Sequence, residues 1–306
     1  MALDAPLAQA CSAIELATPD TLDIKTFFDP ETFTATHLVV DRASKRAAII
    51  DPVLDFDPAS GRTSTVSADA IIAHVKSAGV TVDWLLETHA HADHLSSASY
   101  LKSELGGLIG IGAEITHVQS VFAGIFNLGE DFKRDGSQFD QLFYDGDSFD
   151  LGSQTVHILH VPGHTPADIA FIIADAAFVG DTIFMPDYGT ARADFPGGDA
   201  RQLFRSIRRL LSLPNKTRLF LCHDYKAPDR DSFVWETSVE AERSANIHAH
   251  DGIDEDAFVA MREARDKTLG MPRLILPSIQ INIRGGHLPE PESNGTRYLK
   301  LPLDVL

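Results

Sequence analysis

The chain has 306 residues, of which 44% are hydrophobic and 23% are charged, and its formal net charge is −18 at pH 7. This acidity argues against nucleic acid and anionic membrane surfaces as partners, because both require a basic face. No apolar run approaches the roughly 18–20 residues of a membrane span. With two cysteines, Cys11 and Cys222, a disulfide scaffold and a cysteine-rich metal site are excluded, and a cytoplasmic location is expected.

The elements predicted along the chain alternate between strands and helices. Residues 1–20 contain acids but no Lys or Arg, which is unlike a secretion signal, and they are expected to form a loosely ordered leader. Apolar, β-branched runs predict two strands around a turn within 36–51, and further strands at 84–88, 155–161, 169–173, 177–179 and 218–222. Helical spacing predicts helices at 67–78, 98–105, 200–211, 238–247 and 254–267.

Two segments are less regular. Residues 117–145 are predicted to form a helix followed by a long excursion, and the chain from residue 272 is predicted to be a wrapping tail. The alternation elsewhere favours a layered fold. Hairpin-like strand pairs occur beside strand–helix units, so a plain dinucleotide-binding fold is not expected. The glycines of 107–112 lack the dinucleotide-binding spacing, and no G-x-S-x-G motif of a serine hydrolase is present.

The segment T-H-A-H-A-D-H, residues 88–94, carries the strongest chemical signal. It directly follows the apolar run W-L-L-E-T, where a loop leaves a predicted strand. Side chains two residues apart in an extended segment point the same way, so His89 and His91 can reach one metal ion. Asp93 and His94 lie beyond the bend and can face a second position close by. Imidazole and carboxylate together suit borderline metals such as zinc and iron.

Three more candidate ligands, His164, Asp181 and His223, each follow an apolar strand directly. A single histidine after a strand is usually structural. Four such strand ends in one chain predict instead that the side chains converge at one edge of a sheet, with Asp181 placed to bridge two metals or to complete one site. Six other histidines lack this context and are expected to be structural or exposed: His117, His157, His160, His248, His250 and His287.

The order H-x-H-x-D-H, G-H-T, G-D-T and a late histidine resembles the metallo-β-lactamase superfamily over residues 27–248. The resemblance implies an α+β fold, an αββα sandwich of two mixed β-sheets flanked by helices, with metals at its edge. It also implies a catalytic domain at 21–250, with 251–306 as a C-terminal helix and wrapping tail of the same domain.

Segments outside this pattern are similar to the persulfide dioxygenase group of that superfamily. They are F-F-D-P-E-T-F-T-A-T-H-L-V-V-D at 27–41, A-R-A-D-F at 191–195 and C-H-D-Y at 222–225. This resemblance implies one Fe²⁺ per chain, bound by His89, His164 and Asp181. It also implies oxidation of glutathione persulfide, or a related small persulfide, by O2 to sulfite and thiol. His91, Asp93, His94 and His223 would surround the iron or hold a second metal, and Arg192, Tyr225 and Arg243 would contact the substrate.

Ligand counting leaves an alternative open, a glyoxalase II-like hydrolase of thioesters or lactones with two Zn²⁺ per chain, because residues for two metals are present. For Arg192 the alternative is an internal ion pair with Asp194. Residues 118–143, the loop before Arg192 and the tail at 277–289 depart from the animal-type dioxygenases, and they resemble bacterial β-lactamase-like hydrolases of sulfide detoxification. The phenylalanines of the 118–143 segment are expected to be exposed and to suit a homodimer interface: Phe122, Phe126, Phe139 and Phe143.

Overall fold

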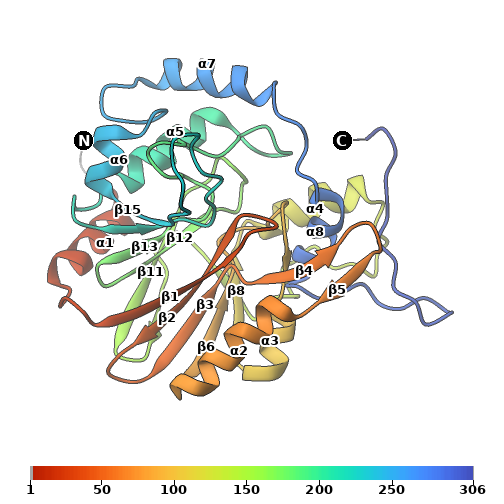
Figure 1. Ribbon diagram of the computed structural model, residues 1–306. Helices are drawn as coiled ribbons and strands as arrows, with labels where there is room; N and C mark the ends of the chain where they lie inside the picture. The colour runs from red at the N-terminus through yellow and green to blue at the C-terminus, as the bar shows by residue number, and fades with distance from the viewer. Residues whose placement is uncertain (1–2, 306) are drawn as a thin grey trace.

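Two six-stranded mixed sheets face each other in the computed structural model, which describes residues 3–305 (Figure 1). The first sheet has the order β1-β2-β3-β6-β8-β9: β1 (Leu22–Asp29), β2 (Thr34–Asp41), β3 (Arg46–Ile50), β6 (Thr81–Leu86), β8 (Leu108–Gly112) and β9 (Gln141–Phe143). The second runs from β10 to β15: β10 (Ser148–Leu151), β11 (Gln154–His160), β12 (Ile169–Ile173), β13 (Ala176–Phe178), β14 (Arg218–Phe220) and β15 (Glu236–Ser238). A small third sheet joins β4 (Val53–Asp57), β5 (Arg62–Ser64) and β7 (Leu95–Ser96).

Helices cover the outer face of each sheet. The first sheet packs against α2 (Val66–Ala78), α3 (Ala98–Leu105), α4 (Ile115–Ile125) and α8 (Ile275–Asn282). The second packs against α1 (Ala5–Leu16), α5 (Ala200–Leu210), α6 (Val239–Ala245) and α7 (Glu255–Asp266). The predicted αββα sandwich is therefore confirmed, and most predicted strands and helices are present within a few residues of their expected bounds.

The strand period of two explains how one strand serves two cores. In β2, Leu38 packs with the helices on the outer face, while its neighbour Val39 packs between the sheets. In β3 the same division separates Ile49 from Ile50. Successive side chains of a strand point to opposite faces, so a nearly continuous apolar run is required where both faces are buried. This accounts for the apolar sequences of these central strands.

The expectation of a loosely ordered leader is wrong for most of residues 1–20. Helix α1 begins at Ala5, where the Asp4 side chain accepts a hydrogen bond from the backbone N–H of Leu7 (2.9 Å). Its inner face, including Leu7 and Ile14, is buried against the second sheet. Arg209 of α5 also binds Asp4, at 2.9 Å. Docking on distant residues makes this segment a helix, and such contacts are not visible in local composition.

The phenylalanines of 118–143 are buried and not exposed, so the predicted dimer surface is wrong. Phe122, Phe126, Phe139 and Phe143 are 2–7% exposed. Phe122 lies on α4, which covers the first sheet, and Phe126 directly follows the end of this helix. The glycines of this segment made it look like an irregular loop, but its aromatic side chains fill the core. The basis for a homodimer at this surface is thereby removed.

Two further sequence expectations concern membranes and disulfides. Within residues 3–305, no helix is both long and apolar enough to cross a bilayer. Cys11 and Cys222 are both free thiols and both buried.

A buried carboxyl group ties helix α6 to the loop after β13. Glu242 is fully buried and accepts a hydrogen bond from the Asn246 amide (2.7 Å), which also donates to the Gly189 carbonyl (3.0 Å). Burial raises the pKa of Glu242 to about 8, and the nearby charge of Asp187 acts in the same direction. The carboxyl group is therefore protonated at neutral pH in the folded chain.

This protonation predicts a pH-dependent stability. Between about pH 4.5 and 8 the unfolded chain loses the Glu242 proton that the folded chain keeps, so this residue makes the free energy of unfolding fall as pH rises. Glu242→Gln keeps an acceptor for Asn246 and removes the titration. Urea unfolding at pH 5 and pH 8 should show a smaller loss of stability for the variant, by about 1 kcal/mol or more. Glu240→Gln, at an exposed position of the same helix, is the control; equal losses in all three proteins would contradict the prediction.

Candidate metal centre

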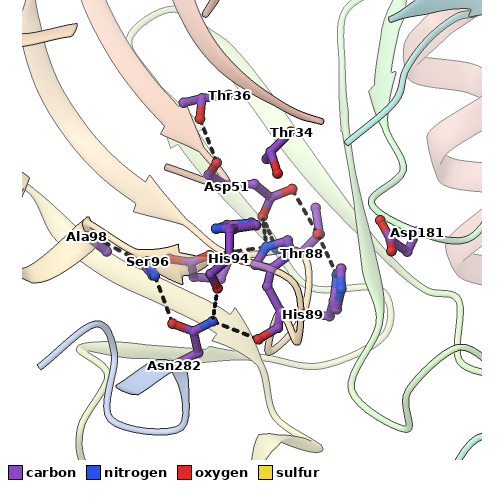
Figure 2. Close-up of polar contacts among 12 residues, drawn as sticks. Thr34, Thr36, Asp51, Thr88, His89, His94, Ser96, Ala98, Asp181 and Asn282 are labelled. Carbon is purple, nitrogen blue, oxygen red and sulfur yellow. Dashed lines mark hydrogen bonds and ion pairs between the residues drawn. The ribbon is translucent and has the colours of Figure 1, made fainter. Parts of the chain in front are cut away.

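The metal-ligand loop connects β6 to β7 and is held by the neighbouring strand β3 (Figure 2). Asp51 follows the end of β3, which pairs with β6 in parallel. Its carboxylate accepts the backbone N–H of Thr88 (2.7 Å) and the Thr88 hydroxyl (2.9 Å). Both residues are about 1% exposed. The turn that begins the histidine motif is therefore fixed by a buried carboxylate before any metal binds.

Hydrogen bonds orient four histidines in the same way. Nδ1 of His94, His164 and His223 lies 2.8–3.1 Å from a backbone carbonyl, of Leu95, Arg192 and Phe33 respectively. A carbonyl only accepts, so each Nδ1 carries the proton and donates it. His89 Nδ1 donates to the Thr88 hydroxyl (3.0 Å), whose own proton goes to Asp51. In all four rings the Nε2 lone pair is left for a metal ion.

The free ligand atoms form two adjacent groups. His89, His164 and Asp181 place one ligand atom each within 4.8 Å of one another, and so do His91, Asp93 and His94. Asp181 lies between the groups, with Oδ2 3.6 Å from His164 Nε2 and Oδ1 3.4 Å from His223 Nε2. His223 Nε2 is also 3.1 Å from Asp93 Oδ2. The seven residues predicted from the sequence thus converge, with Asp181 between the two positions.

The donor set fits a metal ion. Six ligand atoms of these residues are buried without a hydrogen-bond partner: His89 Nε2, His91 Nδ1, Asp93 Oδ2, His94 Nε2, Asp181 Oδ1 and His223 Nε2. A buried polar atom without a partner costs about 1–3 kcal/mol, so six in one place indicate that a cation belongs there. Imidazole nitrogen and carboxylate oxygen suit iron and zinc alike.

Protons and a metal ion compete for the same ligand atoms in this site. Burial opposes the charging of His223, but the carboxylates of Asp93 and Asp181 outweigh it and hold the pKa of His223 well above its usual value. Burial, reinforced by the neighbouring charge of His91, lowers the pKa of His94 to about 3. A proton on His223 Nε2 occupies the position that a metal needs. Metal binding therefore releases protons and weakens as pH falls.

Two glycines allow the turns that carry His164 and Asp181 to pack closely against neighbouring segments. Gly180 precedes Asp181 with φ +52°, and a Cβ there would lie 2.6 Å from the Thr88 hydroxyl oxygen. Gly163 precedes His164 with φ +139°, and a Cβ there would lie 2.2 Å from the backbone nitrogen of Leu203. Any larger residue would push these turns away from their neighbours, which explains glycine before both ligands.

Two carboxylates that sequence reasoning did not assign to the site support His91. Asp51 Oδ1 accepts from His91 Nε2 at 2.9 Å, and Glu87 Oε2 lies 3.4 Å from the same atom. Burial disfavours charge on His91, but Asp51 raises its pKa well above the usual value. His91 Nδ1 is left without a hydrogen bond. Asp51 and Glu87 also directly follow apolar strands, and the strand-end rule that found the other ligands could have found them.

Asn282, at the end of α8, is the third contributor that sequence reasoning missed. Its amide donates to the carbonyls of His91 (2.7 Å) and His94 (2.8 Å), and its oxygen accepts the N–H of Ser96 (2.8 Å) (Figure 2). One side chain thus satisfies three backbone groups of the ligand loop. The Ser96 hydroxyl in turn donates to Glu87. No local sequence signal links residue 282 to the motif 190 residues earlier.

Two of the three predicted substrate residues line a cavity of about 370 Å³ that also contacts Asp93, His164 and Asp181. Tyr225 stacks on His223, with ring centroids 5.5 Å apart, and burial raises the pKa of its phenol well above 10. Arg192 also lines the cavity.

The two predicted arginines are engaged differently. Arg192 donates to both carboxylate oxygens of Asp194 (2.6 and 2.8 Å) and to the Gly270 carbonyl (2.7 Å), so the internal ion pair is present and two of its five N–H groups stay available. Arg243 is not part of the cavity lining, and its guanidinium binds Asp251 (2.9 Å).

A sandwich of two mixed sheets with His and Asp ligands gathered in the loops at the strand ends defines a class of metal-dependent enzymes. A family model described as the metallo-beta-lactamase superfamily matches residues 30–223, and the chain belongs to that superfamily.

The chain is similar to two relatives and to one solved structure. The chain is 55% identical to the probable metallo-hydrolase of Burkholderia pseudomallei, over 93% of this chain and all of that protein. It is 31% identical to the mitochondrial persulfide dioxygenase ETHE1 of Bos taurus, over 73% of this chain and 74% of that protein. The crystal structure of ETHE1 from Myxococcus xanthus is similar with a TM-score of 0.69 and 27% identity, over 87% of this chain and all of that one.

The contacts of Asn282 predict that helix α8 supports metal binding. Asn282→Ala leaves three backbone groups of the ligand loop without their partner, and we expect metal affinity to fall about 10–100-fold. Competition with a chromophoric chelator for Zn²⁺ or Co²⁺ measures this directly.

Gln280→Ala is the matched control for this experiment. It removes a similar amide from the same helix, but Gln280 bonds to the tail at Lys300 and not to the ligand loop. Its metal affinity should be unchanged even if its melting temperature falls. Equal metal affinity of both variants and the wild type would refute a positioning role for Asn282.

Proposed function

We propose that the chain is a persulfide dioxygenase with one Fe²⁺ bound by His89, His164 and Asp181. The observation that carries the proposal is this two-histidine, one-carboxylate group, with two of its members, His164 and Asp181, lining a cavity of about 370 Å³. Three protein ligands on one side of a ferrous ion leave positions open for O2 and a substrate sulfur. The similarity to the persulfide dioxygenase ETHE1 of Bos taurus supports the same chemistry.

The overall reaction is RSSH + O2 + H2O → RSH + H2SO3, in which the outer sulfur is oxidised and O2 is reduced. When bound, iron supplies the coordination positions and electrons that activate O2. The chain supplies shape and charge. Phe184 and Phe195 line the cavity and limit water, and the neutral phenol of Tyr225 can donate a hydrogen bond to substrate. The cavity volume of about 370 Å³ is large enough for the persulfide of a small thiol.

A dinuclear zinc hydrolase of thioesters or lactones is the second candidate. It is favoured by the ligand atoms in and beside the second group, because His91 Nδ1 and His94 Nε2 and the adjacent His223 Nε2 all lack hydrogen-bond partners. The 55% identical relative from Burkholderia pseudomallei carries the name of a probable metallo-hydrolase. Two zinc ions in these positions would activate a hydroxide between them.

Metal content and O2 uptake separate the two candidates. Protein purified without added metal should contain about one iron per chain, and it should consume O2 and release sulfite when glutathione persulfide is added. About two zinc ions per chain, no O2 uptake and turnover of a thioester would replace the dioxygenase with the hydrolase.

Substitutions of the two ligand groups provide an independent test. We expect His164→Ala to lose the iron and to reduce O2 uptake to below about 1% of the wild-type rate. His94→Ala should keep one iron and a substantial part of the activity, because His94 belongs to the second group. Circular dichroism checks that both variants fold. Equal loss of metal and activity in both variants would favour a dinuclear centre.

Arg243→Ala tests the substrate role that the resemblance implies for this residue. Its guanidinium is bound to Asp251 and does not reach the cavity, so we expect KM for glutathione persulfide to change less than about twofold. Arg192→Ala, which alters a cavity wall and removes two available donors, should raise KM more. A large rise of KM in Arg243→Ala alone would restore the role of Arg243 and move the substrate site.

A further inference from the structure

The segment between α7 and α8 forms one wall of the cavity beside the metal residues. In Figure 1 it descends from the end of α7 to α8. Leu269, Gly270, Pro272 and Arg273 of this segment line the cavity, as does Arg265 of α7. All lie outside the residues matched by the family model, 30–223. This wall is therefore a feature of the chain's C-terminal part, added to a metal site that the family model covers.

Two other arginines hold the wall in place. Arg192 donates to the Gly270 carbonyl at 2.7 Å, which fixes the backbone of the segment. Arg262 is 1% exposed; it donates to Asp266 (2.9 Å) and to the Thr190 carbonyl (3.1 Å). Asp266 in turn accepts the backbone N–H of Ala193 (2.9 Å). These contacts join α7 to the loop that carries Arg192, so the wall is a fixed surface.

Arg265 and Arg273 are exposed at this cavity, and among residues 3–305 no carboxylate forms an ion pair with either. The exposed arginines of α5 behave differently. Arg201 and Arg205 bind Glu255, and Arg208 binds Asp251. Arginines without an acidic partner in the described part of the chain also occur elsewhere, as at Arg62 and Arg297, but Arg265 and Arg273 lie together at the cavity that holds the metal residues. Two such guanidinium groups at one cavity can bind an anion from outside.

Glu31 is the acidic residue of this cavity outside the metal centre. It lines the cavity from the turn between β1 and β2, but it forms no ion pair with Arg265 or Arg273 within 4 Å. Within residues 3–305 its one hydrogen bond is donated by its backbone N–H to the Asp29 carboxylate, at 3.1 Å. The two guanidinium groups therefore stay available to a ligand.

We propose that Arg265 and Arg273 form a carboxylate-binding subsite that holds the acidic end of a small thiol-derived substrate while its sulfur faces His164 and Asp181. The proposal rests on the proposed function for the identity of the sulfur end alone. Both guanidinium groups and both metal residues line one cavity of about 370 Å³, so one small molecule can contact all of them. This volume is at the small end of ligand sites and suits a carboxylated tripeptide better than a nucleotide-bearing thiol.

Arginine suits this role for two reasons. Its planar guanidinium can hold a carboxylate through two parallel hydrogen bonds, and it stays charged at every physiological pH. Leu269 and Pro272 place apolar surface next to these charges, which strengthens the interaction by excluding water. The subsite would therefore select thiols by the charge of their far end, independently of the chemistry at the metal.

Binding without turnover tests the subsite. Calorimetric titration of the purified holoenzyme with S-methylglutathione should show binding that weakens about tenfold or more in Arg265→Ala and in Arg273→Ala. The diethyl ester of S-methylglutathione, which lacks the carboxylates, should bind the wild type weakly and should lose nothing further in the variants. Arg265→Lys and Arg273→Lys, which keep the charge, should recover part of the affinity.

Lys267→Ala is the matched control. Lys267 is an exposed cation two residues from Arg265, but it lines a different hollow of the surface, beside Asp194 and Asp266. Its removal should leave affinity for S-methylglutathione unchanged. Equal affinity of the wild type and both arginine variants, no preference for acid over ester, or no binding by the wild type would each overturn the subsite.

Two further outcomes have a defined meaning. Tighter binding of S-methyl coenzyme A, with the same losses in the arginine variants, would assign a phosphate to the subsite and overturn the carboxylate assignment. A lack of O2 uptake would overturn the dioxygenase while these binding measurements still decide the subsite, because no turnover enters them.

Discussion

The buried carboxylate of Asp51 is the interaction on which the rest of the site depends. It accepts the N–H and hydroxyl of Thr88 and the Nε2–H of His91, so that strand β3 fixes the start of the ligand loop on its neighbour β6. Burial would raise its pKa, but His91 and the bonds from Thr88 lower it, and the group stays ionised. Through Thr88 the same carboxylate fixes the proton of His89 Nδ1. The pairing of β3 with β6 therefore fixes the orientation of two candidate metal ligands, His89 and His91.

Support for the ligand loop comes from two parts of the chain that are distant in sequence. Asp51 holds it from the first sheet, and Asn282 holds its far side from α8 (Figure 2). The loops that follow β11 and β13 bring His164 and Asp181 to the same place, and glycines allow their close approach. Each of the five histidines is thus oriented by a hydrogen bond, which is the arrangement expected where a metal site exists before metal binds.

Charge is distributed unevenly over the molecule. Most ion pairs of its arginines are made with acidic residues of the helices and loops around the second sheet, as for Arg209 with Asp4 and Asp145. At the cavity, Arg192 and Arg262 pair with Asp194 and Asp266 and fix the wall, while Arg265 and Arg273 form no ion pair within residues 3–305. A strongly acidic chain can thereby attract an anionic substrate locally, since fields are set by nearby charges more than by the net charge.

The sequence by itself determined the central strands and the set of seven candidate metal ligands, because strand ends and the H-x-H-x-D-H spacing are local properties. The sandwich was expected only from the resemblance of these motifs to a known superfamily. It did not reveal α1, whose helix depends on burial against the second sheet, or the burial of Phe122 and Phe126. Asn282 and the wall at Arg265 and Arg273 were decided by tertiary structure alone. Their roles come from contacts across up to 191 residues of sequence, and no local pattern encodes such a distance. The seven candidate ligands lie together in the structure, which added the residues that orient them.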